Sequence, residues 1–241
     1  MSIKFENTEV VGWEAAIRGM RNPRESWEKS DSFFCDPGEC REYCGSNECD
    51  GYGKGYLIGP NDLDLMKRLR NAGTADHRKF MRMIVVYVDI TAPLYWWKEF
   101  DTYKVGTVAN SCSSMYSFHK KEFTLEDFSH EHINNFHGFK SQESYGYEVA
   151  LFENTLRSTI DALNWARKLY LQTGDKQYWW QMIQLLPTSY NQKRTVMLNY
   201  EVLANIYKSR KGHRLDEWNM FCDWIETFPY SELITGDRDG K

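Results

Sequence analysis

The chain has 241 residues with a formal net charge of −4 at pH 7, so no global basic field attracts nucleic acid. Its length is sufficient for one domain with a sizeable core. No apolar run reaches the roughly 18–20 residues that cross a membrane, and the opening MSIKFENTEVVGWE contains no signal-peptide core. We therefore expect a cytoplasmic, single-domain protein over residues 1–241, without membrane or nucleic-acid partners.

Residues 22–58 are rich in Pro, Gly, Asp, Ser and Cys, a composition that indicates an insertion into the domain. This segment contains four of the six cysteines, namely Cys35, Cys40, Cys44 and Cys49. Their spacing lacks the Cys-x-x-Cys pair common in zinc sites. A four-thiolate zinc loop and an exposed insertion with reduced thiols both remain open, and we favour the second. Cys112 and Cys222 lie far from the others and are expected to be free thiols.

Two helices are predicted before the main strand. Residues 14–21 (EAAIRGMR) contain good helix formers. Asn61 is a candidate N-cap for a second helix over residues 62–71, which has acidic residues in its first turn and basic residues in its last. The polar connection TADHRK at residues 74–79 then leads into the strand.

Residues 83–118 contain the most informative stretch of the chain. The apolar run from Ile84 to Ile90 predicts a buried strand, which Pro93 ends. Residues 94–104 predict an amphipathic helix, and its adjacent pair Trp96 and Trp97 cannot both face a core on a regular helix. The polar stretch at residues 107–114 predicts a loop whose hydroxyls, amide and thiol suit a phosphate or sugar site. A solvated loop with local capping bonds is an equally open interpretation.

The second half of the chain is mostly helical. Thr124 begins a capping-type turn, and residues 147–172 carry one broad apolar stripe on a long helix. Further elements are expected as a helix at 176–186, a strand at 195–198, a helix at 201–210 and a helix at 215–228. His130, His132 and His137 are irregularly spaced, so no metal site is expected there.

The order of elements resembles that of flavin-dependent thymidylate synthase. In that family a strand, a short break, an amphipathic helix and an Arg-His-Arg signature are followed by a loop that ends in a serine. The corresponding residues in this chain are Thr102-Tyr103-Lys104 and, after eight residues, Ser113. Met115 stands where the family has an arginine two residues past the serine.

The resemblance extends to residues 9–21 and to most of residues 60–228. The segment AIRGMR resembles an early helix that carries arginines near the substrate. Leu186-Pro187 is followed by Asn199, and the next helix ends in Arg210, which matches a family arginine that contacts the nucleotide. A second family arginine, four residues before the proline, is replaced by Ile183.

This resemblance implies an α+β fold with a central, mostly antiparallel sheet packed by several helices, in a homotetramer with shared active sites. It implies methylation of dUMP to dTMP with methylenetetrahydrofolate and NADPH as co-substrates and FAD as cofactor. The implied catalytic residues are Lys104, Arg210 and Ser113. The implied substrate-binding residues are Asn110, Ser111, Ser114, Asn199 and Asn205, and the implied cofactor-binding residues are His77, Arg78, Lys79 and Tyr103.

Two alternatives remain open at this stage. The replaced signature arginines favour a member of the fold that binds a nucleotide or a protein partner without flavin chemistry. Separately, Cys112 in the polar stretch is a candidate nucleophile toward a pyrimidine base, although the family reaction requires no cysteine.

Overall fold

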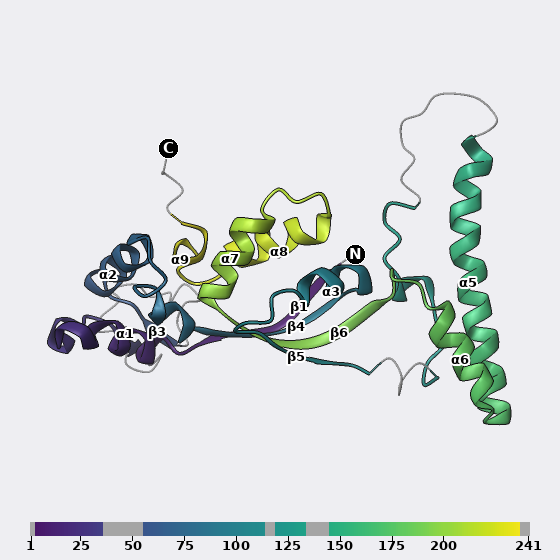
Figure 1. Ribbon diagram of the computed structural model, residues 1–241, viewed down its shortest axis with the longest axis horizontal. Coiled ribbons are helices and arrows are strands. Elements are labelled where there is room, and N and C mark those ends of the chain that lie inside the picture. The colour runs from purple at the N-terminus through teal and green to yellow at the C-terminus, as the bar shows by residue number, and fades with distance from the viewer. Residues whose placement is uncertain (1–2, 36–54, 114–118, 134–144, 237–241) are drawn as a thin grey trace. The chain divides into compact units, whose positions relative to one another are not determined.

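The structure is a computed structural model that describes residues 3–35, 55–113, 119–133 and 145–236 (Figure 1). Most of the predicted insertion lies outside these ranges, as do the candidate site residue Ser114 and the residues Met115 and His137. The chain divides into two compact units, each described here by itself. The first unit comprises Met1–Glu6, Asp89–Thr102 and Ala109–Thr195, and the second comprises Asn7–Val88, Tyr103–Val108 and Val196–Lys241.

The central sheet has four strands in the order β1-β4-β6-β5. The strands are β1 (Lys4–Val11), β4 (Val85–Pro93), β5 (Val108–Ser111) and β6 (Asn191–Asn199) (Figure 1). At one end of the β4–β6 pair, Leu94 N donates to Tyr190 O at 3.0 Å, and at the other end Tyr200 N donates to Ile84 O at 3.1 Å. The residue numbers fall from 94 to 84 along β4 while they rise from 190 to 200 along β6, so the two strands are antiparallel. The predicted α+β class, with an antiparallel sheet packed by helices, is confirmed.

Strand β4 buries only one of its two faces. Val86, Val88, Ile90 and Ala92 are at most 1% exposed, whereas Tyr87 between them is 44% exposed. Because successive side chains of a strand point to opposite faces, this alternation shows one packed face and one open face. The apolar run at Ile84–Ile90 is therefore a strand, as predicted, but it is buried on one face only.

Helix α3 (Leu94–Phe100) supplies large rings to the core of the first unit. Trp96 and Trp97 are both fully buried, contrary to expectation, and the helix ends at Phe100 rather than at residue 104. Trp96 packs with Phe100 and Trp97, with ring centroids 5.1 and 4.9 Å away. The guanidinium of Arg194 lies 4.2 Å from the centroid of the Trp97 ring, and Trp97 Nε1 donates to the Gln192 carbonyl at 2.9 Å. A polar strand residue therefore covers the second indole.

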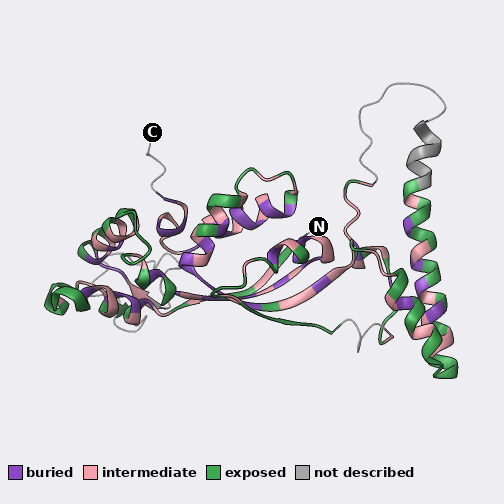
Figure 2. Cartoon of the chain, viewed as in Figure 1, coloured by how far each residue is buried: buried purple, intermediate pink, exposed green. Residues whose placement is uncertain are grey.

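Helices α5 (Tyr145–Thr173) and α6 (Lys176–Leu185) pack side by side (Figure 1). Their shared core consists of Phe123, Phe128, Leu156, Ile160, Leu163, Ala166 and Met182. The same two helices also expose Phe152, Trp165, Leu171, Trp180 and Leu185, and much of α5 is coloured as exposed in Figure 2. Within the described ranges, no helix combines the length and the apolar content needed to cross a bilayer.

The short turn before α5 confirms a predicted cap. The 3-10 turn η5 (Leu125–Asp127) has a capping box, in which Thr124 and Asp127 exchange side-chain and backbone hydrogen bonds. Asn164 of α5 then fixes the neighbouring backbone, because its side chain accepts from Phe123 N and donates to Phe123 O, both at 2.8 Å. These bonds anchor residues 123–127 against α5.

The second unit is mainly helical. Its α-helices are α1 (Trp13–Arg21), α2 (Pro60–Asn71), α7 (Tyr200–Arg210), α8 (Asp216–Glu226) and α9 (Glu232–Thr235). Its 3-10 turns are η1 (Asn22–Arg24), η2 (Trp27–Lys29) and η4 (Lys79–Arg82). An antiparallel hairpin joins β2 (Phe33–Cys35) to β3 (Gly55–Leu57), so both ends of the predicted insertion are folded.

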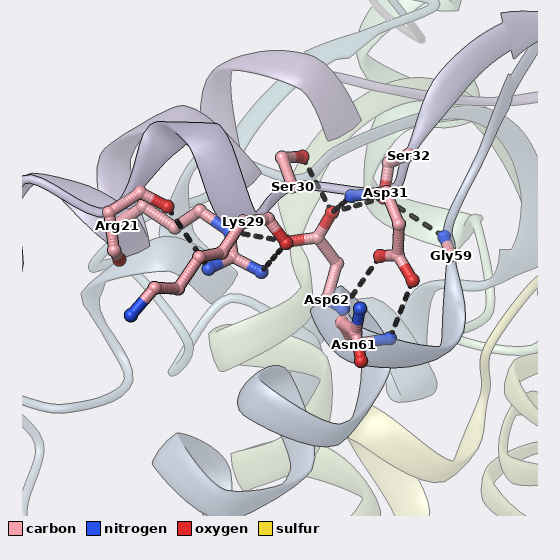
Figure 3. A network of polar contacts seen from close by, with 9 residues as sticks. Arg21, Lys29, Ser30, Asp31, Ser32, Gly59, Asn61 and Asp62 are labelled. Carbon is pink, nitrogen blue, oxygen red and sulfur yellow. Dashed lines mark hydrogen bonds and ion pairs between the residues drawn. The ribbon is translucent and has the colours of Figure 1, made fainter.

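A buried ion pair joins α1 to α2. Arg21 and Asp62 are 5% and 0% exposed, and Arg21 Nε donates to Asp62 Oδ1 at 2.7 Å (Figure 3). Asp62 Oδ2 also accepts from the hydroxyls of Ser30 and Ser32, at 2.7 and 2.6 Å. Burial alone would raise the pKa of Asp62, but these hydrogen bonds outweigh burial and lower it. The Arg21 side chain therefore stabilises the fold through Asp62.

The start of α2 differs from the sequence prediction. Asn61 lies inside the helix, which begins at Pro60, and does not cap it. Asp31 takes that role from a distant position, since its carboxylate accepts from Asn61 N at 2.9 Å and from Asp62 N at 3.1 Å (Figure 3). A cap supplied from another segment leaves no local signal in the sequence.

Candidate functional site

Arg210, the last residue of α7, lies among aromatic side chains in the second unit. Its Nε donates to Tyr103 Oη at 2.8 Å, and its guanidinium lies 4.5 Å from the centroid of the Trp218 ring. Its Nη1 is 3.1 Å from His213 Nε2. A guanidinium that lies over an indole ring and is bonded through Nε has restricted movement, which suits directional binding of an anion.

The signature-like tripeptide supplies one residue of this cluster, Tyr103. Tyr103 is half-buried and reaches Arg210, as described above. Lys104 is exposed, and its side chain makes no ion pair or hydrogen bond with the residues that the structure describes. Thr102 caps the end of α3, because its hydroxyl donates to the Glu99 carbonyl at 2.7 Å. The tripeptide therefore offers one accessible cation.

Asn199 connects the tripeptide turn to α7. Its side-chain oxygen accepts from Val202 N at 3.0 Å, which makes it the N-cap of α7. Its amide group donates to the Gly106 carbonyl at 3.5 Å. Gly106 has φ +79, and a Cβ atom there would lie 2.9 Å from Asn199 Nδ2. Both groups of the Asn199 amide are thus used within the fold.

Asn205 lies halfway along α7 and is exposed. Its backbone carbonyl accepts from the Ser209 hydroxyl at 2.9 Å. It shares a helix with Arg210 but is five residues away, so the two side chains occupy different faces. Exposure is the one observation that supports ligand binding by Asn205.

Arg78 is paired with a buried carboxylate. Arg78 Nη2 lies 3.1 Å from Glu201 Oε1, and the Glu201 side chain is only 8% exposed. Two further atoms of this pair, Arg78 Nε and Glu201 Oε2, are buried and have no hydrogen-bond partner among the residues that the structure describes. His77 and Lys79 on either side are exposed, and Lys79 Nζ lies 3.2 Å from Asp76. A phosphate group could therefore approach His77 and Lys79, whereas Glu201 neutralises Arg78.

The polar stretch of the first unit is partly a strand, so the prediction of a loop over residues 107–114 was wrong for its first half. β5 covers Val108–Ser111, and all four residues are exposed, so the alternation that predicts a strand is absent. Asn110, Ser111 and Ser113 are exposed there. These three residues belong to a different unit from Arg210.

Cys112 follows this strand as an exposed free thiol. Its backbone pairs with β6, because Cys112 N donates to Lys193 O at 2.9 Å and Cys112 O accepts from Gln192 Nε2 at 3.0 Å. The second expected free thiol, Cys222, is buried, and burial raises its pKa to about 11. Both expectations of a free thiol are confirmed.

The structure adds three residues that the sequence analysis did not select, namely His213, Trp218 and Glu201. His213 follows Gly212, whose φ of +74 turns the chain back toward the end of α7. His213 Nδ1 also accepts from Leu215 N at 3.2 Å. A histidine directly after a helix-ending glycine was an available signal, whereas the pairing of Glu201 with Arg78 depends on tertiary structure.

Metal binding can be assessed for only part of the chain. Among the described residues, no group of three or more His, Cys, Asp or Glu side chains is arranged to hold a metal ion. Cys40, Cys44 and Cys49 lie outside those residues. The prediction about a zinc loop therefore concerns residues outside the described ranges.

The fold is similar to that of solved flavin-dependent thymidylate synthases. The structure of ThyX from Helicobacter pylori complexed with FAD and dUMP matches with a TM-score of 0.60 and 16% identity, over 98% of each chain. A second structure of the same enzyme, also with FAD and dUMP, has the same TM-score and identity over 98% of this chain and 97% of that chain. No protein-family model and no curated protein matches the sequence. The similarity therefore concerns the fold.

Proposed function

We propose that this protein is a nucleotide-modifying enzyme that binds a dUMP-like pyrimidine nucleotide, as a diverged flavin-dependent thymidylate synthase. The reaction would methylate dUMP to dTMP, with methylenetetrahydrofolate and NADPH as co-substrates. One observation carries the proposal: Arg210 is held by Tyr103 and stacked on Trp218 in a fold shared with a protein that was solved with FAD and dUMP.

The nucleotide phosphate would bind to two cations of the second unit, Arg210 and Lys104. Arg210 would present a guanidinium whose movement Trp218 restricts, and the exposed ammonium of Lys104 would add a mobile point charge. Lysine lacks the forked geometry of arginine, so we expect weaker orientation of the phosphate than an Arg-His-Arg signature provides. The exposed Asn205 of the same unit would bond the base or the ribose. Substrate binding by Asn110, Ser111, Ser113 and Ser114 stays a prediction from the resemblance.

FAD, when bound, supplies a reducing flavin that NADPH recharges. His77 and Lys79 are accessible and would hold its pyrophosphate, and the ring of Tyr103 would contact the cofactor. Arg78 does not fit this role while Glu201 neutralises it. We assign His77, Lys79 and Tyr103 to flavin binding, whereas Arg78 pairs with Glu201 within the fold.

The proposal is tested by the visible absorbance spectrum of the purified protein and by titration with dUMP. We expect flavin bands that shift on addition of dUMP, and saturable dUMP binding. Lys104→Met should weaken dUMP binding by about tenfold, because one charge-assisted contact is lost. Lys98→Met is the matched control, since Lys98 is also exposed and lies on α3. A protein that binds neither FAD nor dUMP would contradict the proposal.

A second candidate is a nucleotide- or protein-binding member of this fold that has lost flavin chemistry. Two observations favour it: Glu201 neutralises Arg78, and Tyr103 stands where the resembled family has a histidine. A colourless protein that binds dUMP and forms no dTMP would support this candidate over the first.

A homo-oligomer, with a tetramer as in the resembled family, is also proposed. The exposed Trp165 and Phe152 on α5, at 61% and 54%, are candidates for subunit contacts. Light scattering after gel filtration would give the mass. A monomer at all concentrations would contradict this assembly.

A further inference from the structure

His213, in the turn between α7 and α8, has a donor group facing each of its two ring nitrogens. On one side of the ring, the backbone N–H of Leu215 points at Nδ1, and the two nitrogens are 3.2 Å apart. On the other side, Nη1 of the Arg210 guanidinium lies 3.1 Å from Nε2. A guanidinium offers donors and no acceptor, so this second contact also requires a lone pair on the ring.

A neutral imidazole cannot satisfy both contacts. It carries one N–H group and one lone pair, so only one of its nitrogens accepts a hydrogen bond. If Nδ1 accepts from Leu215 N, the proton is on Nε2 and faces an N–H group of Arg210. If Nε2 accepts from Arg210, the proton is on Nδ1 and faces the N–H of Leu215. The two contacts therefore compete, whatever else the ring touches.

The backbone around His213 holds the ring in this position. His213 N donates to the Arg210 carbonyl at 3.0 Å, and the His213 carbonyl accepts from Asn219 Nδ2 at 2.8 Å. The same side chain of α8 accepts from Gly212 N at 3.1 Å through its Oδ1. The guanidinium is restricted as well, by the phenol and the indole ring described above. The competition is therefore built into the turn.

An oxyanion placed between the two side chains would remove the competition. One of its oxygens would accept from Arg210 Nη1 and from His213 Nε2, while Nδ1 accepts from Leu215 N. All three N–H groups then face an acceptor. A negative charge is favoured over a neutral carbonyl, because hydrogen bonds between a guanidinium and an anion are the stronger ones. Both side chains are half-buried.

We propose that His213 binds the nucleotide phosphate, by donating from Nε2 to a phosphate oxygen that Arg210 also holds. Without a ligand, the charge-assisted bond from Arg210 keeps the lone pair on Nε2. When the phosphate binds, the ring gives the proton on Nδ1 to water and takes one from water at Nε2, so its charge is unchanged. The inference rests on the proposed function, because it adds a residue to the phosphate site proposed there.

The first test compares two substitutions that replace different ring nitrogens. His213→Asn places an amide near the position of Nδ1, so it keeps an acceptor for Leu215 N and lacks the donor at Nε2. His213→Gln extends its amide toward the position of Nε2 and keeps a donor there. In isothermal titration calorimetry with the full chain, we expect about tenfold weaker dUMP binding by His213→Asn. His213→Gln is the matched control and should stay within about twofold of wild type.

Two further probes separate the role of His213 from the proposed function. Deoxyuridine lacks the phosphate, and inorganic phosphate lacks the base. The loss in His213→Asn should recur with inorganic phosphate and be absent with deoxyuridine. Equal affinity of wild type and His213→Asn for dUMP would overturn the inference and leave the proposed function standing. Wild type that binds inorganic phosphate but not dUMP would contradict the proposed function, while weaker phosphate binding by His213→Asn would still support the role of His213. Wild type that binds neither would overturn both.

Nitrogen NMR of the imidazole rings reads the tautomer in the wild-type chain, so this measurement needs no variant to fold. The signals of His213 are assigned through their correlation with its own backbone. We expect the proton to be on Nδ1 in the free protein and on Nε2 in the complex with dUMP, or with inorganic phosphate if only that ligand binds. A histidine that only caps the turn would keep one tautomer throughout. The same tautomer in the free and bound protein would overturn the inference.

Discussion

Arg210 Nε donates a 2.8 Å hydrogen bond to Tyr103 Oη, which ties the end of α7 to the middle residue of the tripeptide at Thr102–Lys104. The resembled family has a histidine at that position, where this chain has a phenol. The bond therefore holds the arginine at its Nε atom. Trp218 covers one face of the same guanidinium.

Removal of the Tyr103 hydroxyl is expected to release Arg210. Tyr103→Phe keeps the ring but removes the acceptor of Arg210 Nε, so a half-buried guanidinium loses one charge-assisted hydrogen bond. We expect a loss of about 1–2 kcal/mol in the free energy of unfolding, measured by urea denaturation. Tyr87→Phe is the control, because Tyr87 is 44% exposed and should tolerate the change. Equal stability of both variants would show that the bond contributes nothing.

The two arginines of α1 are expected to differ strongly in their contribution to stability. Arg21→Ala leaves Asp62 buried without its cation and should lower the free energy of unfolding by about 3–5 kcal/mol. Arg18→Ala removes only an exposed pair with Glu14, at 3.6 Å, and should cost less than about 1 kcal/mol. Both variants are compared by thermal and urea unfolding. Similar losses would contradict the burial of the Arg21–Asp62 pair.

The lowered pKa of Asp62 makes part of the stability dependent on pH. Its ordinary value is 3.8, and the folded value lies below it. The contribution of this carboxylate is therefore complete above about pH 5 and is lost as pH falls through the lowered folded pKa. The difference in unfolding free energy between wild type and Asp62→Asn should be constant from pH 7 to 5 and should shrink toward pH 2.5. A difference that grows in acid would contradict the direction of the shift.

The positions of the helices and of the main strand follow largely from local sequence patterns. Residues 147–172 predicted α5 through their apolar stripe, and Pro93 and Gly174 correctly marked the ends of elements. Local rules failed where a distant group decided the outcome. Asp31 caps α2 in place of Asn61, and Arg194 covers Trp97 so that two adjacent indoles are buried.

The candidate site was predictable only in part. The position of Arg210 at the end of a helix could be read from the sequence, but its partner Trp218 lies on the next helix and had no motif. Arg78 was expected to face a cofactor, yet a carboxylate from α7 pairs with it. Ion pairs between distant elements leave no periodic pattern in the sequence. A count of basic residues therefore overestimates how many cations a ligand can reach.

Among the glycines that the structure describes, Gly12 is expected to be the least tolerant of a side chain. Gly12→Ala must adopt φ +94 and would place its Cβ atom 2.1 Å from Met83 O, so the backbone between β1 and α1 must shift. We expect a loss of about 3 kcal/mol or more. Gly174→Ala separates the two causes, because Gly174 also has a positive φ, +68, but no atom of the described residues lies within 4 Å of an added Cβ. That variant should lose only about 1 kcal/mol. Equal unfolding free energies for the two variants would mean that the close approach to Met83 is relieved without cost.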